Sequence, residues 1–225
     1  MKTPDIIMDF ERPQRCGISE AVFCQYKTVE QLETILSLAK QNQQSLLFTR
    51  LTSQKYQRLK PNWQAKINYH ENCQCAVFGS PKPLIEEEST HIAIVSAGSS
   101  DAPICEETKL TLNYHGIKVD LFQDIGVAGL WRLQQQLPQL QTYNIIIAIA
   151  GMEAALPTVL AGLIDTPIIA VPTSIGYGVA AGGHVALNAC LSSCTGGIMT
   201  MNIDNGYGAA CAAIKIYKKI IKNNI

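Results

Sequence analysis

The chain has 225 residues, of which 47% are hydrophobic and 16% are charged. This balance allows a sizeable buried core in one large domain or two unequal ones, and the small share of charge favours an oligomer. Lys and Arg equal Asp and Glu at 18 each, so the net charge gives no indication of a nucleic-acid or membrane partner.

Cysteine usage, the N-terminus and the hydropathy pattern together predict a cytoplasmic protein. The eight cysteines are spread along an apolar chain, and we expect reduced packing residues rather than a disulfide framework. The first 17 residues contain early acids and lack the apolar stretch of a signal peptide. The most apolar region, 145–171, includes two acids and two prolines, whereas a membrane-spanning helix needs about 20 uninterrupted apolar residues.

Residues 1–88 are expected to form a small α+β domain or arm. Thr28 and Gln31 have the spacing of a capping box, which predicts a helix from Val29 with its apolar residues on one face. The other expectations are an irregular segment at 1–30, a strand at 46–49, a helix at 53–59, a polar stretch at 60–75 and a linker around Pro81, Pro83 and Glu86–Glu88.

From residue 89 to 225 the pattern becomes regular. Strands are predicted at 92–98, 119–123, 144–151, 167–171 and 198–201. Helices are predicted at 103–114, 129–137, 153–163, 185–192 and 207–222. Alternation of this kind with short connections predicts parallel strands joined by right-handed crossovers. The fold class is therefore α/β, a doubly wound parallel sheet preceded by the smaller N-terminal domain.

The loops that follow the strands are expected to gather at one edge of the sheet and to form a ligand crevice. Small and hydroxyl-bearing residues in the first loop favour an anion, Asp124 favours a ribose or a metal, and Arg132 favours a phosphate. Tight turns and helix caps would account for the same residues equally simply. The candidate ligand-binding residues are Ser96, Gly98, Ser99, Ser100, Asp101, Asp124, Gly126, Arg132, Gly151, Met152, Thr173, Ser174, Gly176, Tyr177, Gly178, Asn202, Asp204 and Asn205.

Glu153 and Cys194 are the candidate catalytic residues. Glu153 follows the most apolar strand, where it is either a helix-terminus charge or a general base or metal ligand. Cys194 precedes the last strand and is expected to face the same crevice, either as a nucleophile or as a packing residue. Composition and spacing favour packing, and Cys190, one helical turn earlier, is assigned to packing.

Five motifs, in order, resemble the LarB family of nickel-pincer nucleotide cofactor biosynthesis. They are SAGSSDAP, DIGVAGLWR, AGMEAALPTVLAG, AVPTSIGYG and SSCTGG with NIDNGYGAA, and they span residues 90–225. The C-terminal domain of that family is similar to the AIR carboxylase PurE of purine synthesis. The N-terminal segment resembles the family more loosely, through Arg15-Cys16-Gly17, Lys27-Thr28 and Thr49-Arg50.

The resemblance implies a reaction. LarB-like enzymes carboxylate the pyridinium ring of nicotinic acid adenine dinucleotide with CO2 or bicarbonate and hydrolyse its phosphoanhydride. The products are pyridinium-3,5-biscarboxylic acid mononucleotide and AMP. Cys194 matches the family's cysteine and Glu153 its acid, and a homo-octamer is implied. We expect a divalent cation, Mg2+, held by Glu153 and Asp124, because anhydride hydrolysis needs charge neutralisation.

Two departures from the family pattern bear on fine specificity. Trp131 stands where a histidine is expected before Arg132, and Gly196-Gly197 replace a proline-containing turn. Two alternatives remain, an AIR carboxylase or mutase and a non-catalytic nucleotide-binding subunit. The first would use a histidine in the loop after the second strand, and the loop 124–132 has none.

Overall fold

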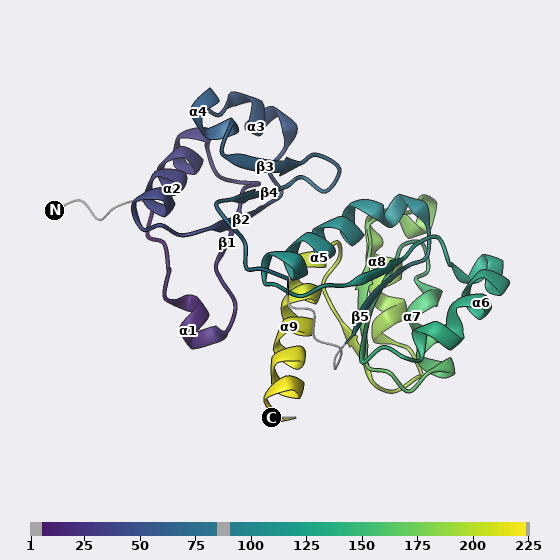
Figure 1. Ribbon diagram of the computed structural model, residues 1–225. Coiled ribbons are helices and arrows are strands. Elements are labelled where there is room, and N and C mark those ends of the chain that lie inside the picture. Colours follow the sequence, from purple (N-terminus) through teal and green to yellow (C-terminus); the bar gives the residue numbers. More distant parts are fainter. Residues whose placement is uncertain (1–5, 85–90, 224–225) are drawn as a thin grey trace. The chain divides into compact units, whose positions relative to one another are not determined.

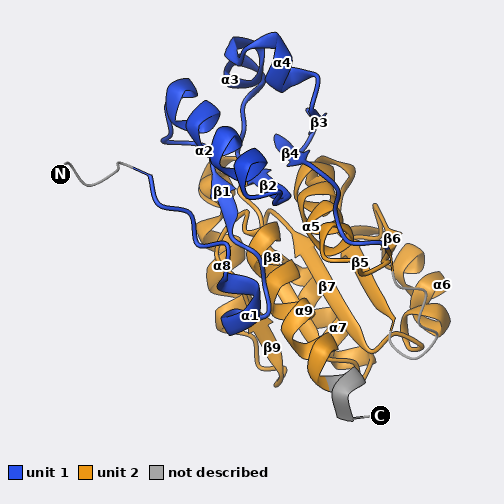
Figure 2. Ribbon diagram, turned by 60° about the vertical axis from the view of Figure 1, so that its left-hand side comes forward, with its two compact units in different colours: residues 1–83 blue, residues 84–225 orange. Residues whose placement is uncertain are grey.

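The computed structural model describes residues 6–84 and 91–223, which fall into two compact units, 1–83 and 84–225 (Figures 1 and 2). The domain boundary expected at 88/89 lies outside the described residues. Within the described ranges, no helix combines the length and the apolar character needed to cross a membrane.

Unit 1 is a four-stranded mixed sheet with helices, in the strand order β1-β2-β4-β3. Its elements are α1 Arg12–Cys16, β1 Ala21–Phe23, α2 Val29–Gln41, β2 Leu46–Thr49, α3 Ser53–Arg58, α4 Pro61–Gln64, β3 Ile67–His70 and β4 Cys75–Phe78. The capping box at Thr28 and Gln31 is present, with hydrogen bonds of 3.2 Å and 3.0 Å. Leu32, Ile35 and Leu36 of α2 then pack on Val22 and Phe48 of the sheet.

Unit 2 is a five-stranded parallel sheet in the order β6-β5-β7-β8-β9. Its strands are β5 Ile92–Ser96, β6 Asp120–Phe122, β7 Ile145–Ala150, β8 Ile168–Pro172 and β9 Ile198–Thr200. Its helices are η1 Ser99–Asp101, α5 Ala102–Tyr114, η2 Val127–Gly129, α6 Leu130–Leu140, α7 Ala155–Leu163, η3 Gly178–Gly183, α8 His184–Leu191 and α9 Gly206–Asn223. The predicted doubly wound α/β fold is confirmed.

The two faces of this sheet are covered by different helices. Leu133 of α6, Leu160 of α7 and Cys190 of α8 belong to one buried cluster with Ile146 and Ala148 of β7. On the other side α5 packs against α9, which also contacts β7 and β8. Burial on both faces explains why β7 is apolar throughout. Cys190 is buried, as expected of a packing residue.

Candidate functional site

The candidate crevice is the carboxyl edge of the five-stranded sheet. The chain leaves β5 and turns toward β6 on one side, and β7 lies on the other side of β5, so the strand order reverses between β5 and β7. Ligands of open α/β sheets bind at this switch point, outside the carboxyl ends of the strands. The loops there begin at Ala97 and Gly151, and the Ala97 N–H donates to the Ile149 carbonyl at 3.0 Å.

Asp101 joins two of these loops. Its carboxylate accepts hydrogen bonds from the Gly98 N–H at 3.0 Å and from the Thr173 hydroxyl at 2.8 Å. Only 3% of Asp101 is exposed, and Thr173 is fully buried. Burial raises the pKa of Asp101, and the two donors and the nearby Asp204 charge modify that shift. Asp101 therefore holds the first loop against the end of β8.

Asp204 has a similar role at the next strand of the sheet. Its carboxylate accepts from the Ser174 N–H at 2.7 Å, and its own N–H donates to the Pro172 carbonyl at 2.9 Å. The Met152 N–H donates to the Ile175 carbonyl at 2.7 Å, which connects the loop after β7 to the loop after β8. The loops after β5, β7, β8 and β9 thus form one hydrogen-bonded rim.

Backbone strain is concentrated on the same rim. Three residues of this rim other than glycine have positive φ, namely Met152 at 54°, Ala154 at 46° and Asp204 at 54°, and Asp124 in the loop after β6 has a φ of 57°. Each such conformation costs of order 1–3 kcal/mol and persists only where the surroundings enforce it. Strain of this kind gathers at ligand-binding sites, which supports the assignment of this edge.

Two predicted glycines are required by close approach of the backbone. A Cβ at Gly126 would lie 2.5 Å from the Ala97 carbonyl oxygen. A Cβ at Gly151 would lie 2.3 Å from the Ile175 carbonyl oxygen. The absence of a side chain at these glycines lets the backbones of neighbouring loops come into contact. The glycines therefore shape the crevice and offer no side-chain contact to a ligand.

Asp124 and Arg132 form an ion pair with 2.6 Å between Oδ2 and Nη1. Glu153 is exposed on the loop after β7. Within the described ranges, no three His, Cys, Asp or Glu side chains are grouped so as to hold a metal ion. The Arg132 guanidinium contacts one oxygen of the Asp124 carboxylate, so a cation bound by Asp124 would have to share or replace this ion pair.

Of the other candidate ligand-binding residues, some are exposed to solvent and others are buried with hydrogen-bond partners. Ser99 and Ser100 of η1 are exposed, and Tyr177 is 78% exposed just before Gly178, where η3 begins. Ser96 is buried, and its hydroxyl donates to the Gly98 carbonyl at 3.4 Å.

Two asparagines at this edge bond to their own loop. The Asn205 side chain caps α9 by accepting from the Gly208 N–H at 2.8 Å, and that of Asn202 accepts from the Ile203 N–H at 2.9 Å. The oxygens of both asparagines are thus engaged in local structure.

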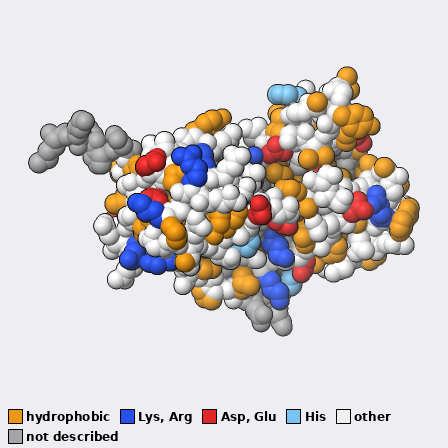
Figure 3. Space-filling model, turned by 90° about the horizontal axis from the view of Figure 1, so that it is seen from above, with side chains coloured by type: hydrophobic (Ala, Val, Ile, Leu, Met, Phe, Trp, Pro, Cys, Tyr) orange, Lys and Arg blue, Asp and Glu red, His pale blue; other side chains and the backbone are white. Residues whose placement is uncertain are grey.

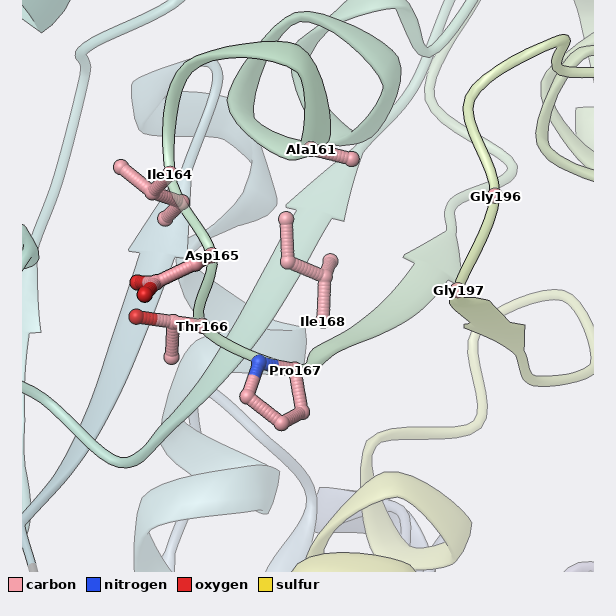
Figure 4. Close-up of a pocket in the computed structure, with 8 residues that line it drawn as sticks. All are labelled: Ala161, Ile164, Asp165, Thr166, Pro167, Ile168, Gly196 and Gly197. Atoms are coloured by element: carbon pink, nitrogen blue, oxygen red, sulfur yellow. The ribbon is translucent and has the colours of Figure 1, made fainter.

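Cys194 lies elsewhere, and the expectation that it faces the same crevice is wrong within one chain. A loop that precedes a parallel strand reaches the amino edge of the sheet, opposite the loops that follow the strands. Gly196 and Gly197 of this loop line a pocket of about 400 Å³ with Asp165, Thr166 and Pro167, which precede β8 (Figure 4). The Thr158 hydroxyl of α7 donates to the Ser193 hydroxyl at 2.9 Å and fixes the start of the loop. Cys194 itself is exposed.

Some of these contacts have no signal in the sequence. The Ile175 carbonyl and Thr158 carry no chemistry that marks them, because one acts through its backbone and the other lies inside a helix. The pairing of Asp101 with Thr173 joins two predicted residues that are 72 positions apart. Only the sheet order brings them together.

The fold and the loops define unit 2 as an AIR carboxylase-type α/β domain. The AIR carboxylase family model matches residues 91–223. The model of the LarB/PurE-like N-terminal domain matches residues 6–80, which is most of unit 1. The chain therefore belongs to the AIR carboxylase family and, with both domains present, is a LarB-like protein of that family.

Two curated relatives come from Methanocaldococcus jannaschii. Uncharacterized protein MJ0165 is 33% identical over 221 residues, covering 94% of this chain and 83% of the relative. The N5-carboxyaminoimidazole ribonucleotide mutase is 31% identical over 132 residues, covering 56% of this chain and 77% of the mutase. The first relative spans both units, and the second aligns with little more than half of the chain.

Two solved structures are also similar, a single-residue variant of Treponema denticola PurE2 and Treponema denticola PurE. They share 17% and 15% identity with this chain, at TM-scores of 0.41 and 0.40. Both matches cover 60% of this chain, and they cover 96% and 93% of the respective structures. At these values the likeness bears on neither substrate nor mechanism.

Proposed function

We propose that this protein carboxylates the pyridinium ring of nicotinic acid adenine dinucleotide and hydrolyses its phosphoanhydride. The observation that carries the proposal is the exposed thiol of Cys194 on an AIR carboxylase-type domain. The other cysteines described in unit 2 are buried or half-buried, namely Cys105, Cys190 and Cys211. The LarB/PurE-like domain in unit 1 supports the same assignment.

A thiol suits this chemistry because a pyridinium ring is too electron-poor to attack CO2. The Cys194 thiolate adds to the ring carbon para to nitrogen, and the displaced π electrons neutralise the ring nitrogen. The resulting dihydropyridine is an enamine, and its nucleophilic carbon forms a bond to CO2. That carbon then loses its proton to water, and the thiolate departs with the electrons of the C–S bond. The net change replaces one ring hydrogen by a carboxylate, without an oxidant or a reductant.

Hydrolysis of the anhydride adds one water across the P–O–P bridge and releases AMP. Glu153, which is exposed on the loop after β7, would orient or deprotonate such a water. Ser99 and Ser100 of η1, just before α5, offer N–H and hydroxyl donors to a phosphate. No step is assigned to a divalent cation, because Asp124 is already paired with Arg132.

The two halves of this chemistry lie at opposite edges of one sheet. Glu153 belongs to the carboxyl edge, and the Cys194 loop reaches the amino edge beside Pro167. The proposal therefore requires a second copy of the chain to bring its Cys194 to the crevice of the first. An assembly of several copies, such as the octamer implied by the family resemblance, would meet this requirement.

The alternative function is that of an N5-carboxyaminoimidazole ribonucleotide mutase, favoured by the relative of that name. In unit 2 the histidines are His91, His115 and His184, so the loop after β6 has none. A mutase would lack its expected histidine there and would have no need of Cys194. The dinucleotide reaction is for this reason the better supported of the two.

The test is incubation with nicotinic acid adenine dinucleotide and 13C-bicarbonate, followed by mass analysis. We expect AMP and a labelled biscarboxylated mononucleotide from the native protein. Cys194→Ala is expected to lower the yield at least ~1,000-fold, since removing a covalent nucleophile costs roughly that much or more. Cys16→Ala removes the exposed thiol of unit 1 and should retain full yield. Turnover of carboxyaminoimidazole ribonucleotide without dinucleotide turnover would establish the mutase instead.

A further inference from the structure

Unit 1 has a parallel strand pair of its own, with a crossover helix between the strands. β1 is followed by α2 and then by β2, and the register pairs Phe23 with Thr49. Past the strand ends, the Cys24 N–H donates to the Thr49 carbonyl at 2.9 Å. The loop after β1 and the residues after β2, beginning with Arg50, therefore lie together at one edge. This is the kind of edge at which parallel sheets bind nucleotides.

Two aromatic rings stand exposed at this edge. Phe23 is 48% exposed and Tyr26 is 82% exposed. Their ring centroids are 6.0 Å apart and the planes are tilted by 58°. Exposed aromatic faces bind bases by stacking, and every base offers a flat face to them. Hydrophobic side chains lie among charged ones on other areas of the surface too (Figure 3), but here the two rings adjoin a strand end.

Positive charge adjoins the rings. The Lys55 ammonium donates to the carbonyls of Cys24 at 2.7 Å and Gln25 at 2.6 Å, which leaves one of its three N–H groups for another acceptor. Among the ion pairs of residues 6–84 and 91–223, none involves Lys55. Burial raises the pKa of the Cys24 thiol to about 12, and the charges of Lys55 and Lys27 oppose that rise, so both ammonium groups are near.

The two units differ in net charge, and the difference favours phosphate binding by unit 1. Residues 1–83 contain eleven Lys and Arg against seven Asp and Glu, and residues 84–225 contain seven against eleven. The crevice loops of unit 2 carry four acids, Asp101, Asp124, Glu153 and Asp204, and one cation, Arg132. Cationic side chains strengthen phosphate binding, and unit 1 has the excess of them.

We propose that the edge formed by the ends of β1 and β2 binds a nucleoside monophosphate group, with the base against Tyr26 and Phe23 and the phosphate on Lys55. Unit 1 is then a nucleotide-binding module rather than a structural appendage. The choice of adenine as the base rests on the proposed function, because the dinucleotide and its product AMP both contain an adenylate group.

The test is photolabelling of the full chain with 8-azido-AMP, competed with AMP, and location of the label by peptide mass analysis. We expect label within residues 21–28 and suppression by AMP more than by ribose 5-phosphate, which lacks the base. Tyr26→Ala should weaken AMP binding about tenfold, as loss of one stacking partner typically does. Tyr26→Trp keeps an aromatic face and should bind AMP at least as well as the native chain. Tyr26 is so exposed that neither variant should change the melting temperature.

Two results would overturn the proposal. One is label confined to residues 91–223, and the other is AMP affinity that is unchanged in Tyr26→Ala. Neither measurement depends on turnover, so Cys194→Ala should bind AMP as the native chain does. Failure to make carboxylated product with normal labelling of 21–28 would count against the proposed function alone, and the reverse pattern would count against this site alone.

Discussion

The two edges of the five-stranded sheet are built in different ways. At the carboxyl edge, side-chain and backbone hydrogen bonds join four loops, strained residues are held in place, and glycines allow backbone contact. At the amino edge, the Cys194 loop contains Gly196 and Gly197, and a Cβ on either would meet nothing within 4 Å. The first edge is preformed for a ligand. The second leaves open space around Gly196 and Gly197, which the proposed exchange of Cys194 between copies would fill.

The largest expected effect is at Gly151. Gly151→Ala would place a Cβ 2.3 Å from the Ile175 carbonyl oxygen and 2.7 Å from the Thr173 hydroxyl. The clash should lower the free energy of unfolding by about 3 kcal/mol, at the upper end of the usual range for overpacking. Urea unfolding of the variant measures this. A loss below about 0.5 kcal/mol, typical of surface substitutions, would show that the carboxyl edge is less rigid than described.

A smaller effect is expected from Asp101, and it depends on pH. Burial raises the folded-state pKa of Asp101 above its ordinary value of 3.8, so the folded state retains its proton to higher pH than the unfolded state does. The contribution of this group to stability is therefore greatest below pH 3.8 and declines as pH rises through the folded pKa. Asp101→Asn removes that dependence.

The measurement is the difference in unfolding free energy between the native chain and Asp101→Asn at several pH values from about 3.5 upward. We expect the native advantage to shrink as pH increases. An advantage that grows with pH would mean that the hydrogen bonds from Thr173 and Gly98 outweigh burial and hold the pKa down.

The smallest effect is expected at Gly196. Its φ is not in the left-handed region and a Cβ has open space, so Gly196→Ala should stabilise the chain by about 0.5 kcal/mol through the unfolded state. Gly197 has the same open space but a φ of 88°, so Gly197→Ala is the matched control and should cost about 1 kcal/mol. The melting temperatures of the two variants separate the effect of backbone conformation from the effect of steric space. An equal loss of stability in both variants would show that neighbouring atoms fill the space around both glycines, contrary to the structure.

The sequence predicted the architecture of unit 2 well, because the three central strands β5, β7 and β8 are apolar runs. Ile145–Ala150 is buried at every position, and the α2 cap was readable from Thr28 and Gln31. In unit 1 the strands β1, β3 and β4 were missed. They have three or four residues each, and β3 has exposed and half-buried side chains after its first residue, so it shows no apolar run.

The sequence predicted which residues form the candidate site but not how they are arranged. Glycines, acids and hydroxyls after strands mark a crevice, and the structure places Asp101, Thr173, Ser174 and Asp204 together there. Cys194 was misplaced, although the predicted parallel strands already assign a loop before a strand to the edge opposite the loops that follow strands. Strand direction settles that: residues before β9 and residues after β7 lie at opposite ends of parallel strands.

A mixed assembly tests the proposal that Cys194 of one copy acts at the crevice of another. Cys194→Ala and Glu153→Gln chains, each inactive alone, are co-expressed with different tags and purified as hybrids. If thiol and crevice come from different copies, random assembly leaves about a quarter of the sites complete, and that share of carboxylated product should return. If both residues of a site belong to one chain, no site in the hybrid is complete. Hybrids as inactive as either parent would contradict the supply of Cys194 by a second copy.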